Sequence, residues 1–247
     1  MTAAAVDTLR ADRAALLEIG ARLTDAQWQA GSGCAGWSVK DVVSHLGALY
    51  WLATDPAALP DTSGMPTEQA QDAVVAARRP MSAADVLADY ESVSRRGLDV
   101  LASLAGQQAE VALGDFGSYP ASLLPSAYSF DHYTHIRADL FAPRGPLPGP
   151  PPSSDGRLGP VLDWIEAALP QQNATRLGAL SGTLMITVTG DNDRVIRLGQ
   201  GGPVARISSD APAFVRWVTQ RGSWAELGVL ASGGEAQLAI ARSLHVF

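Results

Sequence analysis

The chain has 247 residues, of which 47% are apolar and 17% charged, and its formal net charge is −7. This length and composition predict a globular protein of one large or two small domains. The negative charge, without any basic cluster, argues against nucleic acid and anionic membranes as main partners.

The single cysteine, Cys34, excludes an internal disulfide framework and favours a reducing compartment. Charged residues interrupt the first 20 positions, so we expect no signal peptide. No stretch is long and apolar enough to span a bilayer. These features together predict a cytoplasmic protein, a monomer or weak homo-oligomer, whose partners are small molecules.

The first half of the chain has the pattern of amphipathic helices, beginning with helical spacing of apolar residues over 6–23. A short turn and two further helices are predicted to begin where Ser or Thr is followed at the third position by Asp or Gln, the spacing of an N-terminal capping box. The turn begins at Thr24 with Gln27, and the helices at Ser38 with Asp41 and at Ser82 with Asp85. Residues 67–79 and about 123–141 are also helical in pattern. Amphipathic helices of these lengths predict a bundle.

Six prolines between residues 143 and 152 predict a semi-rigid, extended linker. We therefore expect a helical domain over 1–142, a linker over 143–157 and a second domain over 158–247.

The pattern in the second domain alternates with a period of two, which is typical of strands. The predicted elements are a helix over 158–169, strands over 183–189 and 194–198 joined as a hairpin through 190–193, a strand over 204–207, a helix over 211–220, and a last helix to about 244 opened by a capping box of Ser232 and Glu235. The predicted fold class is α+β, a helical bundle followed by a small α/β domain.

The stretch 129–139 contains the residues of greatest chemical interest. Asp131 and His135 are four residues apart, so in a helix they lie on one face, which is otherwise apolar. His45 lies on the apolar stripe of the helix predicted to begin after Ser38, so it also points inward. A buried carboxylate and two imidazoles need a compensating partner. A divalent metal held between facing helices of a bundle would satisfy them.

Several neighbouring residues keep two interpretations open. Asp139 either orients a ligating histidine or pairs with Arg137 or Arg144. Cys34 is either a nucleophile or a small buried thiol. His132 is offset from the face of Asp131 and is a weaker candidate ligand.

Other side chains are candidates for binding the remainder of a ligand. Tyr128 either lines the cavity one turn from Asp131 or fills it, and Trp37 is expected to pack on the start of its helix. Arg78, Arg79 and Arg221 are either clamps for a substrate carboxylate or solvated cations.

Two segments together resemble a known family. The segment Cys34-Ala-Gly-Trp-Ser-Val-Lys-Asp-Val-Val-Ser-His45-Leu is similar to C-x-G-W-[ST]-v-x-D-v-x-x-H-L, and Asp131-His-Tyr-Thr-His135-Ile-Arg137-Ala-Asp139 to E-x-x-x-H-x-R-x-D. Both motifs are those of mycothiol-dependent maleylpyruvate isomerase-like proteins. Residues 233–247 resemble the end of their small C-terminal domain.

This resemblance implies a DinB-like four-helix bundle followed by a small α/β domain related to sterol-carrier-like folds. It implies a divalent metal, usually zinc, held by His45, Asp131 and His135, with mycothiol, the low-molecular-weight thiol of actinobacteria, as cosubstrate. A catalytic arginine of the family matches Arg221. The family's glutamate is Asp131 here, whose carboxylate reaches about 1.5 Å less far.

The leading interpretation is a metal-dependent, thiol-using isomerase or S-transferase acting on a small electrophilic acid or natural-product intermediate. In it, His45, His135 and Arg221 are catalytic, and Tyr128 and Arg78 bind the cosubstrate. One alternative is a metal-free enzyme that uses the same His and Asp side chains as acid–base groups. Another is a non-catalytic protein of the same fold that binds a small molecule.

Overall fold

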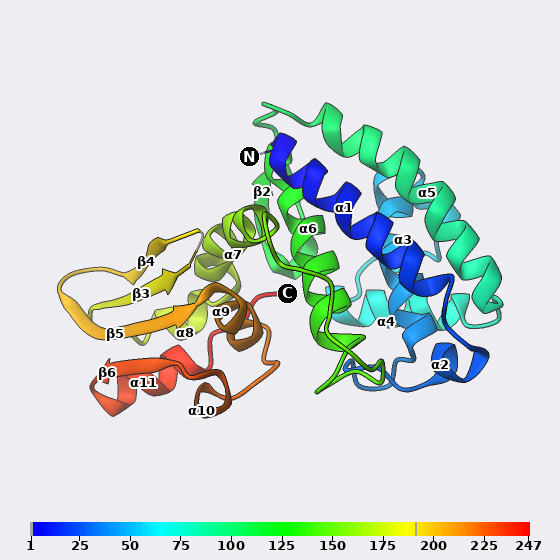
Figure 1. The fold of residues 1–247 in the computed structure, drawn as a ribbon. Helices are drawn as coiled ribbons and strands as arrows, with labels where there is room; N and C mark the ends of the chain where they lie inside the picture. Colours follow the sequence, from blue (N-terminus) through cyan, green and yellow to red (C-terminus); the bar gives the residue numbers. More distant parts are fainter. Residues whose placement is uncertain (1, 191) are drawn as a thin grey trace. The chain divides into compact units, whose positions relative to one another are not determined.

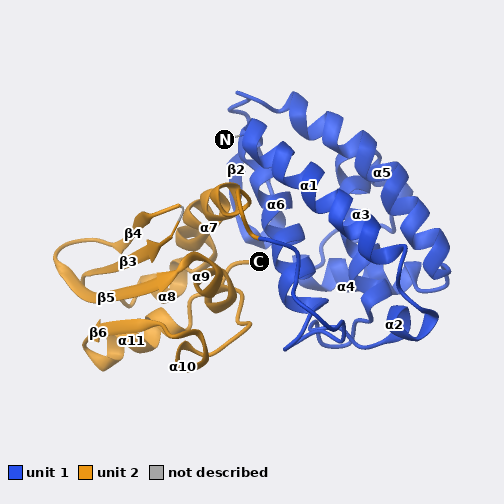
Figure 2. Ribbon diagram, viewed as in Figure 1, with its two compact units in different colours: residues 1–153 blue, residues 154–247 orange. Residues whose placement is uncertain are grey.

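The computed structural model describes residues 2–190 and 192–247. The chain divides into two compact units, residues 1–153 and 154–247 (Figure 2). The first unit is mainly helical and the second combines helices with a sheet, so the predicted α+β class is confirmed. In the described part of the chain, no helix combines the length and hydropathy needed to cross a membrane.

The first unit is built on α1, α3, α5 and α6, which pack as a bundle, with α4 against α3 (Figure 1). Its helices are α1 (Thr2–Gly20), α2 (Asp25–Gln29), α3 (Val39–Thr54), α4 (Thr67–Arg78), α5 (Ala83–Ser103) and α6 (Leu124–Thr134). A short antiparallel pair, β1 (Glu110–Ala112) and β2 (Ser118–Pro120), precedes α6 and was not predicted.

The three predicted capping positions are confirmed, and the short turn after Thr24 is the five-residue helix α2. The Thr24 and Ser38 side chains each accept a hydrogen bond from the backbone N–H three residues on, and the side chain at that position accepts one from the backbone N–H of the cap residue. Ser82 accepts in the same way from the N–H of Asp85. These caps satisfy N–H groups that have no partner inside the helix.

Helices α3 and α5 approach closely where Gly97 meets the ring of Tyr50. A β-carbon at Gly97 would lie 2.2 Å from Tyr50 Cδ1. The apolar residues around this contact follow helical spacing on each helix and form the core of the unit. The main ones are Leu9, Leu16, Val42, Leu46, Val86, Val93, Leu101 and Ile136.

The prediction of one helix over about 123–141 is wrong in its last part, because α6 ends as an α-helix at Thr134. The five residues after α6, His135–Asp139, form a π-helical turn, and the Leu140 N–H bonds to the His135 carbonyl at 3.1 Å. The chain then folds back, and the Leu147 N–H bonds to the Leu140 carbonyl at 2.9 Å. The first residues of the predicted linker are therefore not extended, because the buried side chain of Leu147 packs into the core of the bundle.

The second unit contains, among its described residues, a mixed sheet in the order β4-β3-β5-β6. Strand β3 pairs antiparallel with β4 and parallel with β5, and β5 pairs antiparallel with β6. The elements are α7 (Leu158–Gln172), α8 (Ala174–Leu177), β3 (Thr183–Thr189), β4 (Arg194–Gly199), β5 (Pro203–Asp210), α9 (Ala211–Val218), α10 (Trp224–Leu227), β6 (Leu230–Gly233) and α11 (Glu235–Arg242). Part of the predicted hairpin connection, residue 191, lies outside the described residues.

The predicted capping box of Ser232 and Glu235 is wrong. Ser232 belongs to strand β6, where it is paired with Arg206, and α11 begins after Gly234 without a side-chain cap. Strand β6 follows helix α10, neither of which was predicted. Because Ser232 lies within this strand, it cannot cap α11. The capping box of this region belongs instead to Ser223 and Glu226, at the start of α10.

We predict that Gly97→Ala destabilises the protein by about 1–3 kcal/mol, because the added methyl group overlaps the buried Tyr50 ring and the core is already filled. Urea unfolding of the purified variant measures this loss.

Gly47→Ala is the matched control, because its β-carbon would lie no closer than 3.5 Å to any neighbour. That variant gains helix propensity and is expected to be up to about 1 kcal/mol more stable. Equal stability changes in the two variants would contradict the close packing of α3 on α5.

Candidate metal centre

The three predicted ligands lie together in the first unit. His45 comes from α3, Asp131 from α6 and His135 from the π-helical turn, and one donor atom of each lies within 4.8 Å of the other two. His135 Nε2 is 4.0 Å from Asp131 Oδ1, and the two imidazole ring centroids are 5.1 Å apart. Both histidines are buried, and Asp131 is partly buried.

The other ring nitrogen of His135 has a partner of its own. Its Nδ1–H donates to Asp139 Oδ2 at 2.9 Å, and the Cys34 thiol donates to the same oxygen at 3.2 Å. Asp139 is 0% exposed. Of the two alternative partners of Asp139, Arg137 pairs instead with Asp12 at 2.7 Å, whereas Arg144 Nε does lie 3.9 Å from Asp139 Oδ1. Asp139 therefore has both kinds of partner: its Oδ2 is placed to orient His135, and its Oδ1 faces Arg144.

Cys34 reaches this point because the loop before α3 touches the π-helical turn. The Gly33 N–H donates to the Asp139 carbonyl at 2.8 Å. A β-carbon at Gly33 would lie 2.8 Å from Asp139 Oδ1 and 2.9 Å from its Cα, so this approach requires glycine. The sequence contains no signal for the contact, because it joins residues more than 100 positions apart across a loop.

The two imidazoles of the set are in different protonation states. Burial, together with the neighbouring His135, holds the pKa of His45 well below its usual value, so His45 is neutral. Burial also lowers the pKa of His135, but the hydrogen bonds with Asp139 and Cys34 outweigh it and raise the pKa to about 10. His135 is therefore an imidazolium in the metal-free protein.

This donor set fits a divalent metal ion. Two imidazole nitrogens and one carboxylate oxygen are ligands that zinc accepts, and a set of three leaves a coordination position open. The neutral imidazole that a metal needs is present at His45, and at His135 the ion would displace a proton from Nε2. Asp139 holds the opposite nitrogen, as carboxylates commonly do behind metal-binding histidines.

Trp37 covers both imidazoles. Its ring centroid lies 5.0 Å from that of His45 and 6.3 Å from that of His135. The indole N–H donates to Asp72 Oδ1 of α4 at 2.8 Å, which fixes the ring in place. The prediction of Trp37 as a packing residue at the start of α3 did not include this contact, which only the three-dimensional arrangement reveals.

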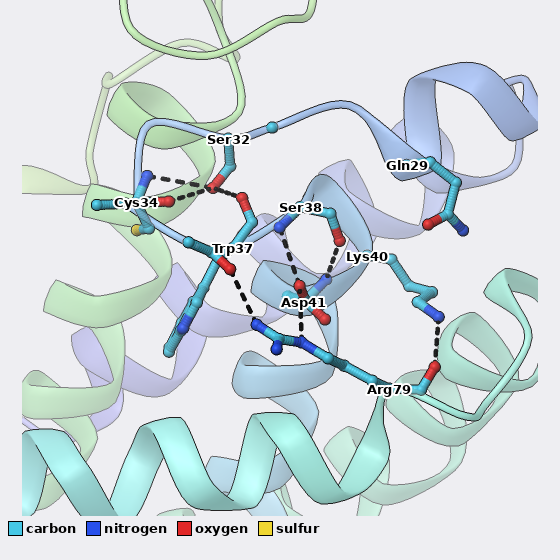
Figure 3. Close-up of a pocket in the computed structure, with 11 residues that line it drawn as sticks. Gln29, Ser32, Cys34, Trp37, Ser38, Lys40, Asp41 and Arg79 are labelled. Carbon is cyan, nitrogen blue, oxygen red and sulfur yellow. Dashed lines mark hydrogen bonds and ion pairs between the residues drawn. The ribbon is translucent and has the colours of Figure 1, made fainter.

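Cys34 and Trp37 also border a pocket of about 520 Å³ (Figure 3). In it, Arg79 donates to the Gly36 carbonyl at 2.9 Å and pairs with Asp41 at 3.5 Å. Lys40 donates to the Arg79 carbonyl at 2.7 Å. The two cations of the pocket are therefore bonded to the protein. The pocket is lined by Gln29, Gly31, Ser32, Cys34, Ala35, Gly36, Trp37, Ser38, Lys40, Asp41 and Arg79.

The remaining predicted binding residues have protein partners. The Arg78 guanidinium pairs with Asp89 and donates to Ser44 Oγ at 2.9 Å. The Tyr128 hydroxyl donates to the Leu49 carbonyl at 2.7 Å. In the second unit, Arg221 donates to the Thr219 carbonyl at 3.1 Å. Their proposed roles in binding or catalysis stay predictions.

The comparisons with known proteins agree with the sequence motifs. Residues 9–135, just over half of the chain, match the family model described as the mycothiol maleylpyruvate isomerase N-terminal domain. A crystal structure of the mycothiol-dependent maleylpyruvate isomerase is similar, with a TM-score of 0.62 and 16% identity, and one of a mutant of that enzyme has a TM-score of 0.61 and 15% identity. Each match covers 94% of this chain and 93% of the other. At these identities the likeness shows the fold. No curated protein matches the chain.

We predict that the metal-free protein loses stability as the pH rises from about 6.5 to about 10. The folded pKa of His135 lies above its usual value of 6.5, so the folded state keeps a proton that the unfolded chain has lost. The stabilisation is complete below pH 6.5 and disappears as the pH passes the folded pKa. The expected loss is on the order of a few kcal/mol.

Urea unfolding in a chelating buffer at several pH values measures this loss. His135→Asn is the control, because it removes the titrating group and leaves the other ionisable side chains in place. If the free energy of unfolding changed with pH in the same way in the wild type and in His135→Asn, the raised pKa of His135 would be contradicted.

Proposed function

We propose that this chain, which belongs to the family of the mycothiol maleylpyruvate isomerase N-terminal domain, is a metal-dependent enzyme that uses mycothiol. It would either isomerise a small electrophilic acid or natural-product intermediate, or join the thiol to it as an S-transferase. The main support is the convergence of His45, Asp131 and His135 inside the bundle, with Asp139 behind His135. The solved structures of similar fold are of a mycothiol-dependent isomerase, which favours the same chemistry.

In this proposal His45, Asp131 and His135 hold the metal, with zinc as the expected ion. Bound there, the ion would supply a Lewis acid that lowers the pKa of a thiol at the open position. Asp131 contributes a negative charge, and Asp139 keeps the His135 ring oriented with Nε2 toward the set. Trp37 shields the two imidazoles from water.

The two proposed reactions begin with the same nucleophile, the thiolate of the cosubstrate. In isomerisation it adds to a conjugated double bond, which becomes a single bond that rotates. Departure of the thiolate restores the double bond in the other geometry. In S-transfer the thiolate displaces a leaving group and stays on the product. The site residues are proposed to bind and orient the thiol in both cases, and Arg221 to bind the substrate carboxylate.

A second candidate function is a metal-free enzyme. It is favoured by the His135–Asp139 pair, because the raised pKa of His135 keeps a proton available at neutral pH. His135 would then act as a general acid and His45, which is neutral, as a base. Chelation distinguishes the two candidates, since only the first loses activity in a chelating buffer.

We predict that the purified protein binds one divalent ion per chain, and that His45→Ala and His135→Ala abolish stoichiometric binding. Asp139→Ala should weaken the affinity for the metal about 10–100-fold, because Asp139 orients the ligand His135 but is not itself one of the three ligands. Metal analysis and competition with a chromophoric chelator measure these changes. His245→Ala, in the second unit, is the matched control and should bind like the wild type.

Asp131→Glu tests the shorter carboxylate directly. If the wild type binds the metal, and Asp131→Glu binds it with similar or lower affinity, the aspartate is a functional ligand. A wild type without metal, together with an Asp131→Glu variant that binds it, would identify a site that has lost its ion.

We predict activity on maleylpyruvate, used as the probe substrate, only when mycothiol is present. Removal of the metal or the substitution His135→Ala should lower the rate by at least about 100-fold, a loss typical for a group that stabilises developing charge. Arg221→Ala should raise KM more than it lowers kcat if this arginine binds the carboxylate. Arg197→Ala, on the exposed side of β4, is its control. Thiol-independent turnover would contradict the proposal, and a mycothiol adduct as the product would favour S-transfer.

A further inference from the structure

A second polar cluster lies in the core of the bundle, and each of the four bundle helices contributes to it. Asp12 of α1, Tyr50 of α3, Tyr90 of α5 and His132 of α6 are all 0% exposed. The imidazole of His132 packs against both phenol rings, with ring centroids 5.3 Å from Tyr50 and 6.1 Å from Tyr90. The two phenol rings are 6.2 Å apart. The three rings therefore form a triangle in the core.

The hydrogen-bonding roles in this triangle are well defined. The Nδ1–H of His132 donates to the Tyr128 carbonyl at 2.9 Å. Because a carbonyl oxygen can only accept, Nδ1 carries the proton, and Nε2 of the neutral ring is an acceptor. Burial raises the pKa of both Tyr50 and Tyr90, so both hydroxyls keep their protons and are donors.

All three of these groups lack a protein partner. Among the described residues, His132 Nε2, Tyr50 Oη and Tyr90 Oη are each buried without a hydrogen bond. Buried polar atoms are rarely left in this state, since each loses its bonds to solvent on folding. One acceptor and two donors from three different helices are chemically complementary, yet they do not bond to one another directly.

Two charged side chains of α1, Asp12 and Arg13, lie near these rings, and each is bonded to another residue. Asp12 itself is held by Arg137, with hydrogen bonds of 2.7 and 3.3 Å. Arg13, from the same helix, donates to Ser94 at 2.7 Å.

We infer that Tyr50, Tyr90 and His132 form a binding site for at least one ordered water molecule in the core of the bundle. A water molecule accepts from the two hydroxyls and donates to His132 Nε2, which gives it the two to four polar partners that a stable internal water needs. A metal ion is disfavoured, because two guanidinium groups lie nearby and the phenols are protonated. An apolar ligand would leave the three polar atoms unsatisfied.

This water would join α3, α5 and α6 by hydrogen bonds. His132 directly follows Asp131 and is three residues before His135, so the site fixes the same helix that presents the candidate metal ligands. The inference does not depend on the proposed function, because it rests on the buried polar atoms of Tyr50, Tyr90 and His132 and not on the candidate metal ligands.

Tyr50→Phe, Tyr90→Phe and the double variant test the inference by the sign of the change in stability. If both hydroxyls bind one water, each single variant lowers the melting temperature by about 2–4 °C, and the loss in the double variant is smaller than the sum of the two. Without the water, each substitution removes an unsatisfied hydroxyl and the melting temperature rises. Independent, additive losses would also overturn a shared water.

Tyr119→Phe is the matched control, because the Tyr119 hydroxyl of the same unit donates directly to the Phe116 carbonyl at 2.5 Å. Its loss of stability should add to that of Tyr50→Phe or Tyr90→Phe. A high-resolution crystal structure gives a second readout. A water peak within about 3.2 Å of the three atoms supports the inference, and an empty or apolar-filled gap there overturns it.

Discussion

The hydrogen bond from His135 to the buried carboxylate of Asp139 is the interaction on which the site depends. A fully buried carboxylate is tolerated only when its oxygens are bonded, and Oδ2 here accepts from both His135 and Cys34. This bond leaves Nε2 of His135 facing Asp131 and fixes the backbone turn that Gly33 touches. The π-helical geometry of that turn is a feature that recurs at functional sites.

The sequence was sufficient to predict the parts of the fold that depend on local rules. Capping residues determine where α2, α3 and α5 begin, and alternation identified β3 and β4, because both signals act over a few neighbouring residues. The juxtaposition of Asp131 and His135 followed from helical spacing alone. Local rules fail where a tertiary contact determines the secondary structure. Ser232 has the spacing of a helix cap, but it lies in strand β6, which pairs with β5.

The same distinction applies to the site. The inward direction of His45 was predictable from the apolar stripe of its helix, whereas the contacts of Cys34, Gly33 and Trp37 join segments far apart in the sequence. No periodic pattern describes where a loop meets a helix. The π-helical turn was missed for a related reason, since the hydrophobic spacing of residues 123–141 resembles that of an ordinary α-helix.

The ring of His135 has different partners at its two nitrogens. Nδ1 faces Asp139 and Cys34, while Nε2 faces Asp131. The thiol of Cys34 is bonded to Asp139 on the side of the ring away from Asp131, where it supports the orientation of His135. The only thiol of the chain is thus engaged in holding the site together. In the proposed function, the thiolate that reacts beside Nε2 of His135 is therefore assigned to a separate molecule, the thiol cosubstrate.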